Sequence, residues 1–184
     1  MKSKIFPFLT VSTAFISAAL VIRFIFLGTD VNAKTFKLSA PQKIQYEGLF
    51  AKESFKLFEG QNVKISELKE PLIMVNFWAT WCIPCLKKFK SIKKLKAEFK
   101  DKLKVIGVNV DEKLSIKEYR NFVNKKKLDF KSVLDPEAKI LSKFHLSHVP
   151  AIIIYHKGKV VHFSNNSKDY KHDKVFSELK KLVQ

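Results

Sequence analysis

The chain lacks the residue patterns that structural metal sites and nucleic-acid-binding sites require. It holds only two cysteines, Cys82 and Cys85, among 184 residues. A structural zinc site needs about four ligands, and no second cysteine pair is present to supply them. There is also no arginine cluster, no stacking-aromatic motif and no internal repeat. We therefore expect no structural metal, no cofactor and no nucleic-acid partner.

Acidic side chains are scarce as well. The sequence has 17 acidic and 35 basic residues, nearly all of the latter lysine, and a formal net charge of +18. Such a surface attracts anionic lipid headgroups, acidic proteins or nucleic acid. Because lysines normally remain exposed, a solvated lysine-rich surface is the simpler interpretation. The apolar content of 46% is sufficient for one ordinary domain with an additional segment.

Both cysteines lie in one short stretch, directly after an apolar run and before helix-forming residues. Pro84, between them, fits a first helical turn because its missing N–H would have no partner there. A cysteine at a helix N-terminus lies among unpaired N–H groups, and this lowers its pKa. We expect Cys82 to be the more accessible sulfur and the nucleophile, and Cys85 to be shielded and to resolve a mixed disulfide. A structural disulfide in a redox-inert binding module is the alternative.

The segment FWATWCIPC, ending at Cys85, resembles the active-site signature of thioredoxin-fold proteins, specifically the TlpA/ResA/DsbE-like thiol-disulfide oxidoreductases of bacterial envelopes. The resemblance extends from about Phe55 to the C-terminus. It implies a thioredoxin-like α/β fold, in which helices flank a central mixed β-sheet. It also implies an N-terminal β-hairpin extension and thiol-disulfide exchange with partner proteins.

Hydrophobic patterns predict the elements of this fold. Residues 72–78 are almost continuously apolar, as in a central strand that is buried on both faces. A helix from Pro84 to about Lys100 and a strand over 103–110 complete a βαβ unit with parallel pairing. Near the C-terminus, a strand opened by Pro150 and a strand over 160–163 are predicted to form an antiparallel hairpin.

The N-terminal region carries an export signal. Lys2 and Lys4 precede a long apolar stretch over 5–27, which is a membrane anchor or a signal peptide cleaved after Ala33. Residues 1–33 are therefore assigned to that segment, 34–54 to a linker and N-terminal extension, and 55–184 to the thioredoxin-like domain. The lysines favour a cytoplasmic N-terminus, so we expect a periplasmic domain tethered to the inner membrane by residues 5–27.

The resemblance also implies a substrate-binding surface. Thioredoxin-like proteins place a cis-proline opposite the cysteine pair, and Pro150 matches that position. The backbone of Val149 would then pair with an extended substrate strand, while Trp81 flanks the cysteines. The other interpretation is a trans-proline that only begins a strand.

Neither of the carboxylates that relatives place near the cysteine pair is present. Asn76 stands where thioredoxins have a buried carboxylate, and the resemblance implies asparagine there in envelope relatives as well. Lys88 stands where those envelope relatives have a glutamate. Helical spacing puts Lys88 on the side of Cys85, where a cation favours thiolate and makes the disulfide more oxidising. We therefore assign Pro84 and Lys88 as redox-tuning residues. Alternatively, Lys88 bends out to water, as we expect of Lys96.

Partner classes follow from the resemblance. It implies a reductant for envelope proteins with cysteine pairs, such as apocytochrome c or a cytochrome oxidase maturation factor, which is itself reduced by a membrane or thioredoxin-like electron donor. A different hypothesis is a copper metallochaperone in which His145 or His148 joins the cysteines. Because imidazole ligands need arranged supporting groups, surface histidines are the simpler interpretation.

Overall fold

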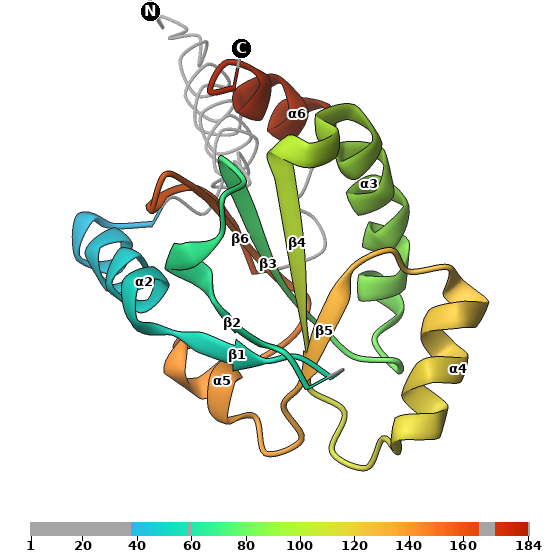
Figure 1. Cartoon of the computed structure of the whole chain (residues 1–184). Helices are drawn as coiled ribbons and strands as arrows, with labels where there is room; N and C mark the ends of the chain where they lie inside the picture. The colour runs from blue at the N-terminus through green and yellow to red at the C-terminus, as the bar shows by residue number, and fades with distance from the viewer. Residues whose placement is uncertain (1–37, 59, 166–171, 184) are drawn as a thin grey trace, which may run out of the picture. The chain divides into compact units, whose positions relative to one another are not determined.

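The computed structural model describes residues 38–58, 60–165 and 172–183 (Figure 1). Its helices and strands are α2 (Ala40–Lys52), β1 (Ser54–Lys56), β2 (Asn62–Lys64), β3 (Leu72–Trp78), α3 (Ile83–Phe99), β4 (Leu103–Asn109), α4 (Ile116–Lys126), β5 (Lys131–Leu134), α5 (Lys139–Lys143), β6 (Ala151–His156), β7 (Lys159–Ser164) and α6 (His172–Lys180). Single 3₁₀ turns cover Ile65–Glu67 and Lys100–Lys102. The predicted signal or anchor over 1–33 lies outside the described residues. Among the described helices, none combines the length and the apolar character that crossing a bilayer would take.

A five-stranded mixed sheet forms the centre of the domain, in the order β5-β4-β3-β6-β7. β3 pairs parallel with β4 and antiparallel with β6, and β4 pairs parallel with β5. All seven residues of β3 are buried, as expected of a continuously apolar central strand. The antiparallel pairing of β6 with β7 matches the hairpin that the sequence predicted. The fold is the expected thioredoxin-like α/β fold.

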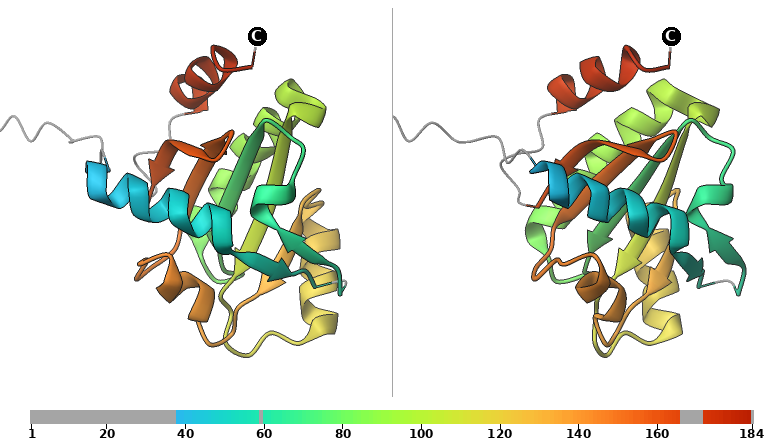
Figure 2. Two further views of the ribbon diagram at one scale, coloured as in Figure 1. Left: turned by 60° about the vertical axis from the view of Figure 1, so that its left-hand side comes forward. Right: turned by 90° about the vertical axis from the view of Figure 1, so that its left-hand side faces the viewer.

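Alternate residues of β3 face two separate cores. Met74 and Trp78 pack in a cluster that includes the inner faces of α3 and α6, and Tyr119 of α4 joins it. Val75 and Phe77 pack in the other cluster with residues of α2 and α5. Figure 2 shows α2 lying across one face of the sheet while α3 lies behind it. The sheet is therefore covered on both sides, which explains why β3 carries no solvent-facing residue.

Helix α2 occupies most of residues 34–54, which were assigned from the sequence to a linker and N-terminal extension with no helix predicted. Ser39 caps the helix through a reciprocal capping box with Gln42. Tyr46 is 4% exposed and packs in the α2-side core. Its carbonyl accepts a hydrogen bond from the Tyr155 hydroxyl at 3.2 Å. The helix is weakly amphipathic because Tyr46 is its only buried residue, so its sequence carries little periodicity.

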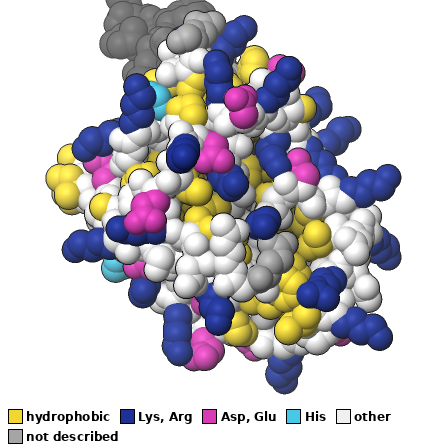
Figure 3. Space-filling view, viewed as in Figure 1, with side chains coloured by type: hydrophobic (Ala, Val, Ile, Leu, Met, Phe, Trp, Pro, Cys, Tyr) yellow, Lys and Arg dark blue, Asp and Glu magenta, His cyan; other side chains and the backbone are white. Residues whose placement is uncertain are grey.

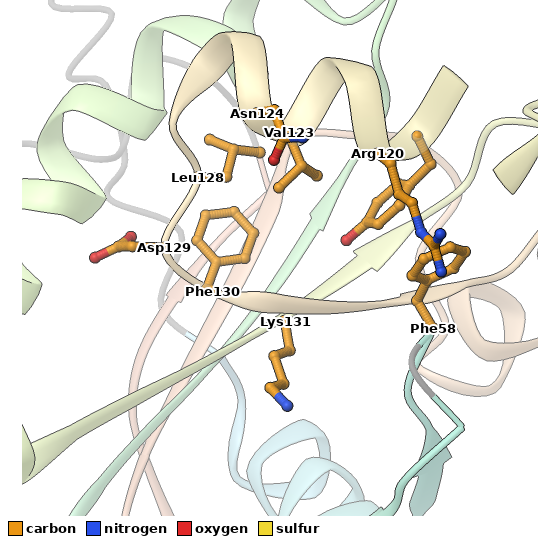
Figure 4. Close-up of a pocket in the computed structure, with 9 residues that line it drawn as sticks. Phe58, Arg120, Val123, Asn124, Leu128, Asp129, Phe130 and Lys131 are labelled. Carbon is orange, nitrogen blue, oxygen red and sulfur yellow. The ribbon is translucent and has the colours of Figure 1, made fainter. Parts of the chain in front are cut away.

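Before β3, the strands β1 and β2 pair antiparallel, with Phe55 opposite Val63. The chain between them reaches the sheet, because the backbone N–H of Phe58 donates to the carbonyl of Ser132 in the edge strand β5 at 2.9 Å. The guanidinium of Arg120 lies 5.4 Å from the centre of the Phe58 ring. Figure 4 shows this junction, where Phe58 and Arg120 line a pocket between α4 and β5. No residue of the cysteine loop lines it.

Candidate active site

The two cysteines form a disulfide at the start of α3, with their Cα atoms 5.2 Å apart. After β3 the chain makes a tight turn in which the N–H of Cys82 donates to the carbonyl of Ala79 at 3.2 Å. Cys82 is the N-cap of α3, and its Sγ accepts a hydrogen bond from the N–H of Cys85 at 3.2 Å. Pro84 lies in the first turn, as its missing N–H predicted. One sulfur is therefore held at the positive end of the helix.

Both cysteines are buried in this disulfide state. Cys82 is 4% exposed and Cys85 is 2% exposed, so the unequal access to water expected from the sequence is small here. The hydrogen bond from Cys85 to the sulfur of Cys82 draws that sulfur over the first turn of α3. A difference in reactivity between Cys82 and Cys85 therefore depends on the position of the Cys82 sulfur at the first turn of α3, as well as on exposure.

An exposed apolar pair flanks Cys82. Trp81 is 67% exposed and Ile83 is 65% exposed. By contrast, Trp78 is fully buried and packs edge-on against Phe89, which assigns it to the core. Exposed large apolar side chains beside a reactive group commonly mark an interaction site. Trp81 thus lies where the sequence analysis placed it, and Ile83 was not anticipated.

Pro150 lies at the same end of the sheet as the cysteine loop. It immediately precedes β6, whose first residue, Ala151, pairs with Phe77 near the end of β3. The Val149–Pro150 peptide bond is cis, as the resemblance implied. Val149 packs against the buried cluster that contains both cysteines. The structure therefore brings Trp81, Val149 and Pro150 to the region of the disulfide.

Lys88 points into the protein. Its residue is 6% exposed, and its Nζ donates to the Ser164 hydroxyl in β7 at 3.2 Å. Of the two alternatives left open by the sequence, the solvent-directed one is wrong. Lys96, in contrast, makes an ion pair of 3.0 Å with Asp129 on a more exposed surface. Asn76 is also buried, at 2% exposure. An amide at position 76 and an amine at position 88 thus occupy the places where relatives have carboxylates.

The copper hypothesis requires a group of metal ligands near the cysteines. Within the described residues, no cluster of three or more histidine, cysteine, aspartate or glutamate side chains is arranged to hold a metal ion. The Nε2 of His148 is 2.7 Å from the carbonyl of Asn165, and its Nδ1 is 3.1 Å from the Ser147 hydroxyl. His148 would have to give up one of these contacts to bind a metal.

One buried carboxylate near the cysteines escaped the sequence analysis. Asp111 follows β4, is 8% exposed and accepts hydrogen bonds from the backbone and side chain of Thr80. A signal was available, because the carboxyl ends of neighbouring parallel strands meet at one edge of the sheet. Thr80 follows β3 and Asp111 follows β4, so their proximity could have been inferred from the βαβ unit.

Basic side chains are spread over the molecular face shown in Figure 3, with acidic side chains interspersed among them. They do not gather into a single patch on that face. This distribution agrees with a solvated lysine-rich surface. The disulfide and its apolar flanks are therefore the features that distinguish the candidate site.

Comparison with known proteins decides the family, because the model of the AhpC/TSA family matches residues 48–163. The chain belongs to the AhpC/TSA family. This family member is 31% identical over 131 residues to the thiol-disulfide oxidoreductase ResA of Bacillus thuringiensis strain Al Hakam, covering 63% of this chain and 74% of that protein. It is 33% identical over 105 residues to ResA of Bacillus subtilis strain 168, covering 55% and 57%.

A solved structure supports the fold of this AhpC/TSA family member. A secreted Mycobacterium tuberculosis disulfide oxidoreductase, described as homologous to E. coli DsbE, superposes with a TM-score of 0.61 at 19% identity. The match covers 72% of this chain and 98% of that one. The enzyme class, thiol-disulfide oxidoreductase, follows from the ResA relatives, and the solved structure supports the fold alone.

Proposed function

We propose that this oxidoreductase exchanges disulfides with envelope proteins through Cys82 and Cys85. The observation that carries the proposal is the disulfide at the N-terminus of α3, with the Cys82 sulfur held by the N–H of Cys85. The N–H of Cys85 and the positive end of the α3 dipole stabilise the thiolate that exchange requires. The exposed Trp81 and Ile83 on either side of Cys82 give a partner protein an apolar surface to contact.

In the reducing direction, the Cys82 thiolate attacks one sulfur of a partner disulfide. The partner S–S bond breaks, a mixed disulfide forms, and the second partner sulfur leaves as a thiolate that takes up a proton. The Cys85 thiolate then attacks the Cys82 sulfur and releases the first partner sulfur. The partner has gained two electrons and two protons, and the domain has returned to its disulfide form.

The substrate segment is proposed to lie between Trp81 and the Val149–Pro150 segment. Both border the disulfide end of the sheet, and Val149 packs against the cluster that contains the cysteines. An extended segment that follows the backbone at Val149 would bring its own sulfur toward Cys82. Pro84 and Lys88 would tune the potential rather than contact the substrate.

We place this reaction in the periplasm, with the domain tethered to the inner membrane by residues 5–27. The support is the lysine-flanked apolar N-terminal stretch and the need of disulfide chemistry for an oxidising compartment. By resemblance, the proposed role is reduction of apocytochrome c or of a cytochrome oxidase maturation factor. A membrane or thioredoxin-like donor would restore the dithiol.

A trapping experiment tests the exchange reaction. Cys85→Ser removes the resolving thiol, so mixed disulfides through Cys82 should accumulate with partner proteins in envelope extracts and with purified, oxidised apocytochrome c. Cys82→Ser is the matched control and should trap none. If Cys85→Ser forms no mixed disulfide with either, the chain is better described as a redox-inert binding module. If it traps other envelope proteins but not apocytochrome c, the exchange reaction stands and the cytochrome c assignment fails.

A further inference from the structure

The buried carboxylate of Asp111 is bound to the loop that carries Cys82. Its Oδ2 accepts the N–H of Thr80 at 2.9 Å, and its Oδ1 accepts the Thr80 hydroxyl at 2.9 Å. Its Oδ2 also accepts the side-chain amide of Asn109 at 2.6 Å. Hydrogen bonds to an ionised acceptor are about twice as strong as neutral ones. Both hydrogen-bond donors of Thr80 are thus held by one carboxylate.

Asp111 is itself fixed to the sheet. Asn109 is fully buried at the end of β4, and its side-chain oxygen accepts the N–H of Asp111 at 3.3 Å. Asn109 also pairs with Trp78, the last residue of β3. The carboxylate therefore has a rigid support on the strand next to the one that leads into the cysteine loop.

Thr80 occupies the first central position of the turn that delivers Cys82. That turn is closed by the hydrogen bond from the N–H of Cys82 to the carbonyl of Ala79. Its second central residue is Trp81, which is directed to solvent at 67% exposure. Fixing Thr80 consequently fixes both the direction of Trp81 and the path of the chain from Cys82 into α3.

We propose that Asp111 is a positioning residue for the exchange reaction. By holding Thr80, it keeps the Cys82 sulfur at the N-terminus of α3 and keeps Trp81 on the surface. The helix lowers the pKa of a thiol only while the sulfur stays within its first turn, because the effect falls off over that distance. The inference rests on the proposed exchange through Cys82, and it adds the residue that holds the nucleophile in place.

A second buried aspartate provides a matched control. Asp135 is 4% exposed and follows β5, the other parallel neighbour of β4. Its carboxylate accepts the N–H groups of Ile140 at 3.1 Å and Leu141 at 2.9 Å, both in α5. Asp111 and Asp135 are therefore comparable in burial, and the carboxylate of each accepts at least one backbone N–H. Of the two, Asp111 is the one that is bonded to the cysteine loop.

The test is a double-mutant cycle on the reduced, purified full-length protein. The rate constant of Cys82 with a small aromatic disulfide and the pKa of its thiol are measured for Thr80→Val, Asp111→Asn and the combined variant. Thr80→Val removes one bond to the carboxylate without changing any charge. It should slow Cys82 by about three- to tenfold, the range expected for one net hydrogen bond, and raise the thiol pKa. Thr80→Ser keeps the hydroxyl and should restore the wild-type rate.

Coupling separates positioning from a charge effect. If Asp111 acts through Thr80, Asp111→Asn should slow Cys82 by a larger factor in the wild-type background than in the Thr80→Val background, where only the bond from the backbone N–H of residue 80 remains. Asp135→Asn should lower the free energy of unfolding and leave the rate and pKa of Cys82 unchanged. Equal effects of Asp111→Asn in both backgrounds would overturn the inference.

Two further outcomes are informative. Variants that are less stable, but whose Cys82 rate and pKa match the wild type, would assign Asp111 a structural role only and so reject positioning. If Asp111→Asn does not fold, the Thr80→Val and Thr80→Ser pair carries the test, and equal rates in the two reject the inference. A wild-type Cys82 no more reactive than Cys85 would instead contradict the proposed function itself, and this inference with it.

Discussion

The side-chain nitrogen of Lys88 lies inside the domain and donates a hydrogen bond to the hydroxyl of Ser164, 76 residues later in the chain. Ser164 pairs with Ile152 in the sheet, and Ile152 packs in the same buried cluster as Cys82 and Cys85. A basic side chain is thus enclosed on the face of the sheet that carries the disulfide. At this depth its charge is screened less than a surface charge would be.

Replacing Lys88 tests whether this charge sets the redox potential. A buried cation favours the thiolate and therefore the dithiol form, which makes the disulfide more oxidising. Lys88→Met should lower the reduction potential by roughly 30 mV, equivalent to about 1.4 kcal/mol. Equilibration with dithiol and disulfide buffers of known potential provides the measurement.

Lys96→Met is the control for Lys88→Met. Lys96 lies two turns further along α3 and pairs with Asp129 near solvent. We expect its removal to leave the potential unchanged. A potential that does not move in Lys88→Met, or that moves equally in both variants, would show that Lys88 has a packing role only.

Substitution of Gly107 by alanine tests how closely the sheet packs against α3 and α4. A Cβ on Gly107 would lie 2.8 Å from Trp78 Nε1 and 2.9 Å from a ring carbon of Phe130, and it would also meet Ser132 Oγ. Because this core has no room for it, Gly107→Ala should lower the free energy of unfolding by about 1–3 kcal/mol. Urea denaturation provides the measurement.

Gly48→Ala is the matched control for Gly107. Gly48 lies inside α2, and a Cβ added there would meet no heavy atom within 4 Å. Alanine is the better helix former, so this change should raise the free energy of unfolding by about 0.5–1 kcal/mol. An unchanged stability of Gly107→Ala would contradict the close packing around Gly107, and a loss of stability in Gly48→Ala would contradict the open surroundings of Gly48.

We expect the buried phenol of Tyr155 to make the protein less stable in alkaline solution. Burial raises the pKa of its phenol well above the ordinary value of 10.0. The folded protein therefore keeps this proton above pH 10, whereas the unfolded chain releases it. Unfolding is then favoured as the pH rises, by up to about 1.4 kcal/mol per pH unit above 10.

Tyr155→Phe separates this contribution from other alkaline effects. The variant lacks the phenol and should show a shallower fall in the free energy of unfolding between pH 9 and pH 11. Tyr46, whose pKa is also raised by burial, would leave a smaller residual slope. Denaturation at several pH values measures both proteins, and identical slopes would count against a buried neutral Tyr155.

The sequence predicted the elements whose signal is local. β3 was recognisable from its almost continuously apolar sequence, and the start of α3 from Pro84 and the two cysteines. α2 was missed because it buries only Tyr46, although the Ser39 and Gln42 capping box was a usable signal. A capping box marks the start of a helix even where the apolar stripe of the helix is too narrow to be recognised.

Contacts between residues far apart in the chain could not be predicted from local sequence patterns. Helical spacing put Lys88 beside Cys85 but left its direction open, because the outcome depends on Ser164 in the last strand. The contact between Thr80 and Asp111 spans 31 residues and depends on how two parallel strands end. The hydrogen bond from the N–H of Cys85 to the Cys82 sulfur likewise forms only in the folded first turn of α3.

Alkylation of the reduced protein over a range of pH, with the two cysteines resolved by mass spectrometry, tests the central claim most directly. Cys82 should react with a pKa clearly below the value of about 8.5 for a free thiol, while Cys85 reacts slowly. Two cysteines that react equally slowly, each with an ordinary thiol pKa, would contradict the assignment of Cys82 as the nucleophile of a thiol-disulfide exchange.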